Sequence, residues 1–169
     1  MTAAEALERS FAEHYEALYR FIRSCGAGDS PAEDCSQEAF LRLHDQLLRN
    51  NRPDNIRAWL FRVAYRLWID CCRHARREIA ADDASWKFWS GLLPDPAPPA
   101  DETLLARERG DWLRRALPKL SQVERQALHL RADGLRYREI AEVLGLTYWS
   151  AVEAVRRALE ILGAEYHGI

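Results

Sequence analysis

The sequence predicts an all-α fold made of two small helical domains. Three observations lead to this prediction. Apolar residues recur every three or four positions through several segments, serine and glycine signals stand where those segments begin and end, and one proline-rich stretch interrupts the pattern. We therefore expect a first domain over residues 1–80, a linker over 81–103 and a second domain over 104–169.

Two helices are expected in the first 50 residues. The first has a buried face of Phe11, Tyr15, Leu18, Ile22 and Cys25, and glycines at positions 26 and 28 end it. The second should begin with a capping box, in which the Ser30 hydroxyl and the Glu33 carboxylate each accept from the other residue's backbone N–H. Its expected core face is Ala39, Phe40, Leu43 and Leu47, and its expected outward face is Glu33, Asp34, Gln37, Glu38 and Arg42.

A third, longer helix is expected over residues 56–78, with a basic side. Its apolar stripe is Leu60, Val63, Ala64, Leu67 and Cys71, and its cationic side is Arg62, Arg66, Arg73 and Arg77. Trp59, Tyr65 and Trp68 interleave with the arginines, an arrangement that suits stacking on unpaired bases beside phosphate contacts. The alternative is that the aromatic side chains fill the core and the arginines are merely solvated. Five arginines against two acids between positions 62 and 78 favour a nucleic-acid surface.

The second domain shows a helix-turn-helix pattern. After the linker, where Trp86, Phe88 and Trp89 are apolar enough to pack on a domain or a partner, a helix is expected from Leu104. Next come a capping box at residues 121–124, a helix that Gly134 ends, a short helix over 137–144, Gly145 and a final helix over 148–162 capped by Thr147. Two short helices joined by a glycine-containing turn have the layout of a DNA-binding helix-turn-helix, which many other αα-hairpins share.

Composition excludes several classes of function. The net charge of −2 argues against a protein that coats nucleic acid non-specifically. The four cysteines lack CxxC spacing and the five histidines are scattered, so we expect no metal, no cofactor and no enzymatic activity. No stretch approaches the roughly 18 apolar residues of a membrane span. A cytoplasmic protein without membrane insertion is expected.

Motifs in both halves resemble those of one protein family. They are AEDCSQEAFL at residues 32–41, AWLFRVA at 58–64, LWIDCCR at 67–73, LPKL at 117–120 and GLRYREIAEVLG at 134–145. In this order, and divided by a linker, they resemble the extracytoplasmic-function (ECF) sigma factors of the sigma-seventy family over nearly the whole chain.

The resemblance implies that the chain makes core RNA polymerase promoter-specific. It implies a polymerase-binding face of Asp34, Gln37, Glu38 and Arg42, and a minus-ten binding surface of Trp59, Arg62, Tyr65, Arg66, Arg73 and Arg77. It also implies a linker that threads toward the polymerase cleft, and an anti-sigma factor that holds the protein in check. The minus-thirty-five element would meet Thr147, Tyr148, Trp149, Val152, Glu153, Arg156 and Arg157, with Glu153 accepting from a cytosine amino group.

Two departures from the family pattern keep an alternative open. Tyr65 and Arg66 stand where the family tends to have an Arg-Asn pair, and the recognition helix carries only Arg156 and Arg157 as cations. The alternative is a sigma-like decoy or adaptor that binds an anti-sigma factor through its second domain without reading DNA. An ordinary helix-turn-helix repressor would leave the first 80 residues without a role.

Overall fold

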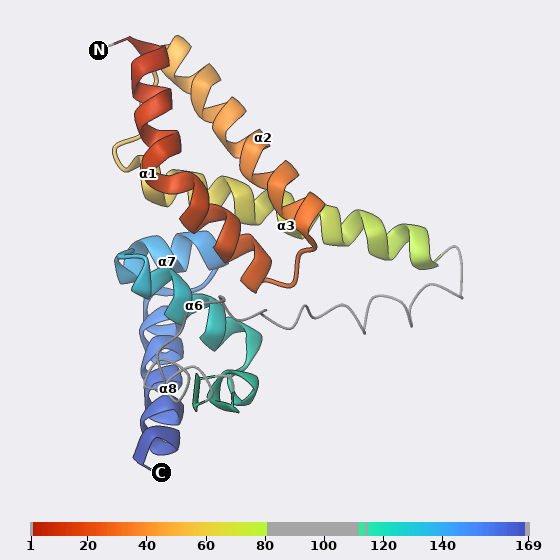
Figure 1. Cartoon of the computed structure of the whole chain (residues 1–169), viewed down its shortest axis with the longest axis vertical. Coiled ribbons are helices and arrows are strands. Elements are labelled where there is room, and N and C mark those ends of the chain that lie inside the picture. The colour runs from red at the N-terminus through yellow and green to blue at the C-terminus, as the bar shows by residue number, and fades with distance from the viewer. Residues whose placement is uncertain (1, 81–111, 114, 168–169) are drawn as a thin grey trace, which may run out of the picture. The chain divides into compact units, whose positions relative to one another are not determined.

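The computed structural model describes residues 2–80, 112–113 and 115–167 (Figure 1). These contain six α-helices with assigned bounds, further helical residues at 112–113 and 115–116, one 3-10 turn and no strand. The predicted all-α class is confirmed. The chain divides into two compact units, Met1–Pro94 and Asp95–Ile169. The predicted linker with Trp86, Phe88 and Trp89, and the start of the helix expected from Leu104, lie outside the described residues.

Helix α1 (Ala3–Ser24) begins well before the first apolar residue of its predicted face. Thr2 and Glu5 form a capping box, in which Thr2 Oγ1 accepts from the Glu5 N–H at 3.2 Å and the Glu5 carboxylate accepts from the Thr2 N–H at 2.8 Å. Leu18 and Ile22 are fully buried, but Phe11 is 46% exposed. The predicted buried face is therefore wrong at Phe11, although Ala6 and Ser10 in the same early turns of α1 are buried.

Helix α2 (Asp29–Leu48) begins one residue before Ser30, with Gly28 as its N-cap. The predicted Ser30 capping box is wrong, because Ser30 lies inside the first turn. Asp29 explains this start: its Oδ1 accepts from Tyr19 Oη at 2.9 Å and lies 3.1 Å from Arg23 Nε, which ties the beginning of α2 to α1. The predicted core face of Ala39, Phe40, Leu43 and Leu47 is confirmed as buried.

Helix α3 (Ile56–Ala80) packs against both α1 and α2 (Figure 1). The Asn55 side-chain oxygen caps it by accepting from the Ala58 N–H at 3.1 Å. Its buried residues are Leu60, Phe61, Ala64 and Trp68, whereas Val63 and Leu67 are half-buried. The predicted stripe is wrong at Cys71, which is exposed. The last turns of α3 extend past the other two helices (Figure 1).

The second unit is a compact cluster of three helices behind a short turn. The turn, η1 (Leu117–Lys119), precedes α6 (Gln122–Ala132), α7 (Tyr137–Leu144) and α8 (Tyr148–His167), and each helix packs on the other two. The predicted capping box is confirmed, because Ser121 Oγ accepts from the Glu124 N–H at 3.3 Å and Glu124 accepts from the Ser121 N–H at 2.8 Å. Helix α8 runs five residues beyond its predicted end at 162.

Gly145 makes the turn between α7 and α8. Its φ of 68° lies in the left-handed region, which favours glycine because a side chain there crowds the backbone. The helix-turn-helix layout predicted from this glycine is present. In the part of the chain that the structure describes, none of the helices combines the length and apolar character needed to cross a lipid bilayer.

Candidate nucleic-acid interface

The basic side of α3 is open to solvent. Arg66, Arg73 and Arg77 are exposed, and Arg62 is half-buried closer to the bundle. Arg73 Nη1 lies 3.6 Å from Asp70 Oδ1, but both side chains are largely exposed and the pair lies on the surface. Surface pairs of this kind contribute little and exchange readily with other partners. The three exposed guanidinium groups are therefore available to phosphate.

The three aromatic residues of α3 divide into two kinds. Trp68 is buried and belongs to the core. Tyr65 and Trp59 are half-buried, and the Tyr65 ring lies 5.9 Å from the Phe21 ring of α1. A ring that is packed on one side and open on the other offers a rigid stacking surface. The alternative that the aromatic side chains fill the core is therefore right for Trp68, whereas Tyr65 and Trp59 keep a solvent-facing edge beside the arginines.

The outward face of α2 is polar with two apolar positions that sequence reasoning missed. Asp34, Gln37 and Arg42 are exposed and Glu38 is half-buried, and Arg42 Nε donates to Glu38 Oε1 at 2.8 Å. On the same face, one and two heptads beyond Asp34, lie Leu41 and Leu48, with 62% and 60% of their surface exposed. Residues seven positions apart lie on the same face of a helix, so this spacing could have identified both leucines from the sequence.

The start of α8 presents aromatic side chains. Thr147 Oγ1 accepts from the Ser150 N–H at 3.1 Å and lies 2.8 Å from Ser150 Oγ, so its hydroxyl is occupied as a helix cap. Trp149 is 76% exposed, Tyr148 is also exposed and Val152 is half-buried. Apart from Ser150, whose hydroxyl pairs with that of Thr147, the exposed side chains of the first turn are therefore aromatic.

The two arginines of α8 are already paired with carboxylates of the same helix. Glu153 accepts from Arg156 Nε at 2.8 Å and Nη2 at 2.7 Å, and also from Arg157 Nε at 2.8 Å. Arg156 Nη1 donates in addition to Glu160. These hydrogen bonds from Arg156 and Arg157 hold the pKa of Glu153 well below its usual range, at about 2.

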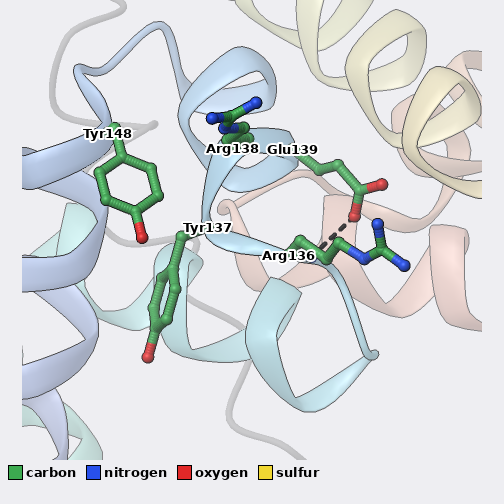
Figure 2. Close-up of a pocket in the computed structure, with 5 residues that line it drawn as sticks. All are labelled: Arg136, Tyr137, Arg138, Glu139 and Tyr148. Carbon is green, nitrogen blue, oxygen red and sulfur yellow. Dashed lines mark hydrogen bonds between the residues drawn. The ribbon is translucent and has the colours of Figure 1, made fainter.

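A shallow hollow of about 490 Å³ lies where α7 begins and the start of α8 approaches it (Figure 2). It is lined by Arg136, Tyr137, Arg138, Glu139 and Tyr148. The Glu139 carboxylate accepts from the Arg136 N–H at 2.7 Å, and the Tyr137 and Tyr148 rings meet edge to face at 6.3 Å. Arg136 and Arg138 are exposed cations near the start of α8 that sequence reasoning did not single out.

Cysteine, histidine and acidic side chains are the potential metal ligands of the chain. Within residues 2–80, 112–113 and 115–167, no three His, Cys, Asp or Glu side chains are placed to hold a metal ion. The four cysteines, all within the described residues, are not joined in disulfides: Cys25 and Cys35 are buried, Cys72 is half-buried and Cys71 is exposed. Burial raises the pKa of the Cys35 thiol to about 11.

Comparison with known proteins identifies the family. The family model for Sigma-70 region 2 matches residues 11–78, and the model for Sigma-70, region 4 matches residues 110–162. The ECF RNA polymerase sigma factor EcfG of Rhodopseudomonas palustris is 28% identical over 165 residues, which cover 97% of this chain and 87% of that protein. The ECF sigma factor SigE of Mycolicibacterium smegmatis is 26% identical over 89% of this chain, which spans only 57% of that relative's length.

A solved structure supports the same fold. The sigma factor RpoE from Bartonella quintana, determined in complex with the anti-sigma factor NepR, matches with a TM-score of 0.70 at 21% identity. The match covers 96% of this chain and 98% of that one. The two family-model matches place both halves of the chain, in the order predicted from its motifs, in one family. The chain belongs to the sigma-70 family, as an RNA polymerase sigma factor of the extracytoplasmic-function group that acts in transcription initiation and is not an enzyme.

Proposed function

We propose that the chain works in the cytoplasm and opens promoters at the minus-ten element through the basic side of α3. The observation that carries this proposal is the exposure of Arg66, Arg73 and Arg77 along one side of a helix whose opposite side is buried. A row of cations on a rigid support can follow a separated strand, because phosphate contacts position a nucleic acid without regard to its sequence.

Tyr65 and Trp59 would hold the unpaired bases. Flipping a base out of a duplex costs a few kcal/mol, and stacking on an aromatic ring returns about 1–3 kcal/mol per base. The packing of Tyr65 on Phe21 supports this role, since a ring that is already fixed loses little conformational freedom when a base stacks on it. Arg62, which is closer to the bundle, would contact the same strand from its inner edge.

Core polymerase would bind the outward face of α2. Asp34, Gln37, Glu38 and Arg42 supply the polar contacts, while Leu41 and Leu48 supply the apolar ones. Interfaces commonly combine an apolar centre with a polar surround, and two exposed leucines amid charged residues fit that composition.

The second unit would read the minus-thirty-five element with the first turns of α8. Tyr148, Trp149 and Val152 offer apolar contact to thymine methyl groups in a major groove. Thr147 would act there mainly as the cap that sets the helix start. An anti-sigma factor is proposed as a further partner, because the similar RpoE structure contains one. No observation favours the decoy alternative over initiation.

The test is transcription in vitro with purified core polymerase and a promoter library. Replacing Arg66 and Arg73 by alanine should abolish promoter opening, read by permanganate reactivity of unpaired thymines, and leave binding to core polymerase unchanged. Replacing Arg9 and Arg20, two exposed arginines of α1, removes the same charge elsewhere and should leave opening intact. Equal loss of opening and polymerase binding in the α3 variant would mean that α3 has only a structural role.

A further inference from the structure

The cations of the recognition helix are arranged around one carboxylate. Glu153 Oε1 accepts from both Arg156 Nη2 and Arg157 Nε, and Glu153 Oε2 accepts from Arg156 Nε. Glu160 takes a further N–H of Arg156 from the next turn. The spacings of three and four residues place all four side chains on neighbouring positions of one helix surface.

This arrangement leaves the surface without net charge. Two carboxylates balance two guanidinium groups, so a DNA phosphate that approaches α8 meets paired rather than open cations. The affinity of non-specific DNA binding depends on how many phosphates are neutralised, and each of these arginines must first leave its carboxylate to neutralise one. Protonation does not release them near neutral pH, because a glutamate is already ionised there and the two arginines lower the pKa of Glu153 further.

We propose that Glu153 is a positioning residue that determines specificity: it occupies Arg156 and Arg157 in the free chain, so that α8 engages a duplex only where base contacts accompany the exchange of carboxylate for phosphate. The proposal rests on the function proposed above, in which α8 faces promoter DNA. The exchange is feasible because all these side chains are substantially exposed, and ion pairs in water are weak individually. At the promoter sequence, base contacts from Trp149 and Tyr148 favour the exchange of carboxylate for phosphate.

The inference changes the role expected for Glu153 itself. As a base reader it would accept from a cytosine amino group, but both of its oxygens already accept from arginine. The two roles predict opposite results when the carboxylate is removed. Loss of a base reader weakens binding to the promoter, whereas loss of a masking group strengthens binding to every duplex.

The experiment uses the full-length chain and a fluorescent duplex of random sequence, with anisotropy measured between about 50 and 200 mM salt. Glu153→Gln keeps the size and helix propensity of the side chain and should tighten binding at low salt. The slope of log K against log salt should steepen by about 0.9 for one freed arginine and about 1.8 for two. Each added phosphate contact should therefore make the loss of affinity between about 50 and 200 mM salt about 3.5-fold larger.

Glu165→Gln is the matched control. It removes the same charge from the same helix, and the cation that it releases is Lys119 rather than an arginine of the recognition surface. Its salt slope should remain that of the unmodified chain. A slope that steepens equally in both variants would overturn the proposal, because net charge alone would then account for the effect.

Two further outcomes separate this inference from the function on which it rests. If Arg156→Ala with Arg157→Ala weakens promoter binding by the reconstituted holoenzyme but Glu153→Gln fails to strengthen duplex binding, the masking role is wrong and the DNA-facing role of α8 stands. If the double arginine variant leaves promoter binding unchanged, the proposed role of these arginines in DNA binding fails as well.

Discussion

Phe61 stands at the centre of the first unit, and its removal should destabilise that unit more than any exposed aromatic change. Its side chain is fully buried, and its ring centroid lies 5.3 Å from that of Phe21. Truncating a buried phenylalanine to alanine costs about 3–5 kcal/mol, because apolar contacts are lost and a cavity remains. Since whole domains are stable by about 5–15 kcal/mol, Phe61→Ala should leave the first unit marginal.

Phe11→Ala is the matched control in the same unit. Phe11 is 46% exposed, and its ring contacts Tyr15 at 4.5 Å and Phe40 at 5.0 Å. Half the burial energy of a phenylalanine, together with modest ring contacts, amounts to about 1–2 kcal/mol. The two variants should therefore differ by about 2 kcal/mol, which at a urea m-value of about 2 kcal/mol/M is about 1 M in midpoint.

The assay is urea unfolding of the full chain with hydrogen exchange read peptide by peptide, which separates the first unit from the second. Phe61→Leu, which retains most of the volume, should lose less than about 1.5 kcal/mol and provides a variant that folds. The second unit's transition should not move in any of the three variants. Equal destabilisation by Phe61→Ala and Phe11→Ala would refute the assignment of Phe61 to the centre of the core.

Three further predictions concern backbone, proton and thiol chemistry. Gly145→Ala should destabilise the second unit by about 1 kcal/mol, because its φ of 68° is strained for alanine, whereas Gly163→Ala inside α8 should stabilise it by about 0.5–1 kcal/mol; thermal unfolding distinguishes the signs. Burial, followed by the nearby Arg57 charge, lowers the pKa of His14 below its usual 6.5, so the unfolded chain takes up the proton first. The contribution of neutral His14 to the free energy of unfolding is present above pH 6.5 and is lost as the pH falls. His14→Gln should therefore flatten the dependence of unfolding free energy on pH, and an unchanged slope would contradict this role of His14. Iodoacetamide at pH 8 should label exposed Cys71 in the native chain and spare Cys35, whose thiol pKa is about 11; equal labelling rates by mass spectrometry would argue against this burial.

Local signals predicted much of the fold because they depend on residues close in sequence. The capping box at Ser121 and Glu124 and the left-handed glycine at 145 both formed as expected. The Thr2 and Glu5 box carried the same signal and was overlooked. The Ser30 box did not form, since contacts of Asp29 with α1 begin the helix one residue earlier.

The sequence predicted which residues make up the candidate interface, but not which of their side chains are already paired with other residues. The basic side of α3 follows from a spacing of four and seven residues, and it is exposed. The pairing of Glu153 with Arg156 and Arg157 also follows from helical spacing, although the sequence interpretation treated the three as separate DNA contacts. The site residues themselves stay predictions that the experiments above test.

The order of residues along this chain was sufficient to specify an all-helical protein, the faces of most helices and the family, because periodicity and capping act within one or two turns. Which members of an apolar face become buried was decided only by packing. Trp68 is enclosed and Cys71 exposed three residues later, and Phe11 is left half open, because burial depends on where neighbouring helices begin and end. Contacts between neighbouring helices, such as that of Asp29 with Tyr19, are not contained in capping or periodicity rules that act within one or two turns.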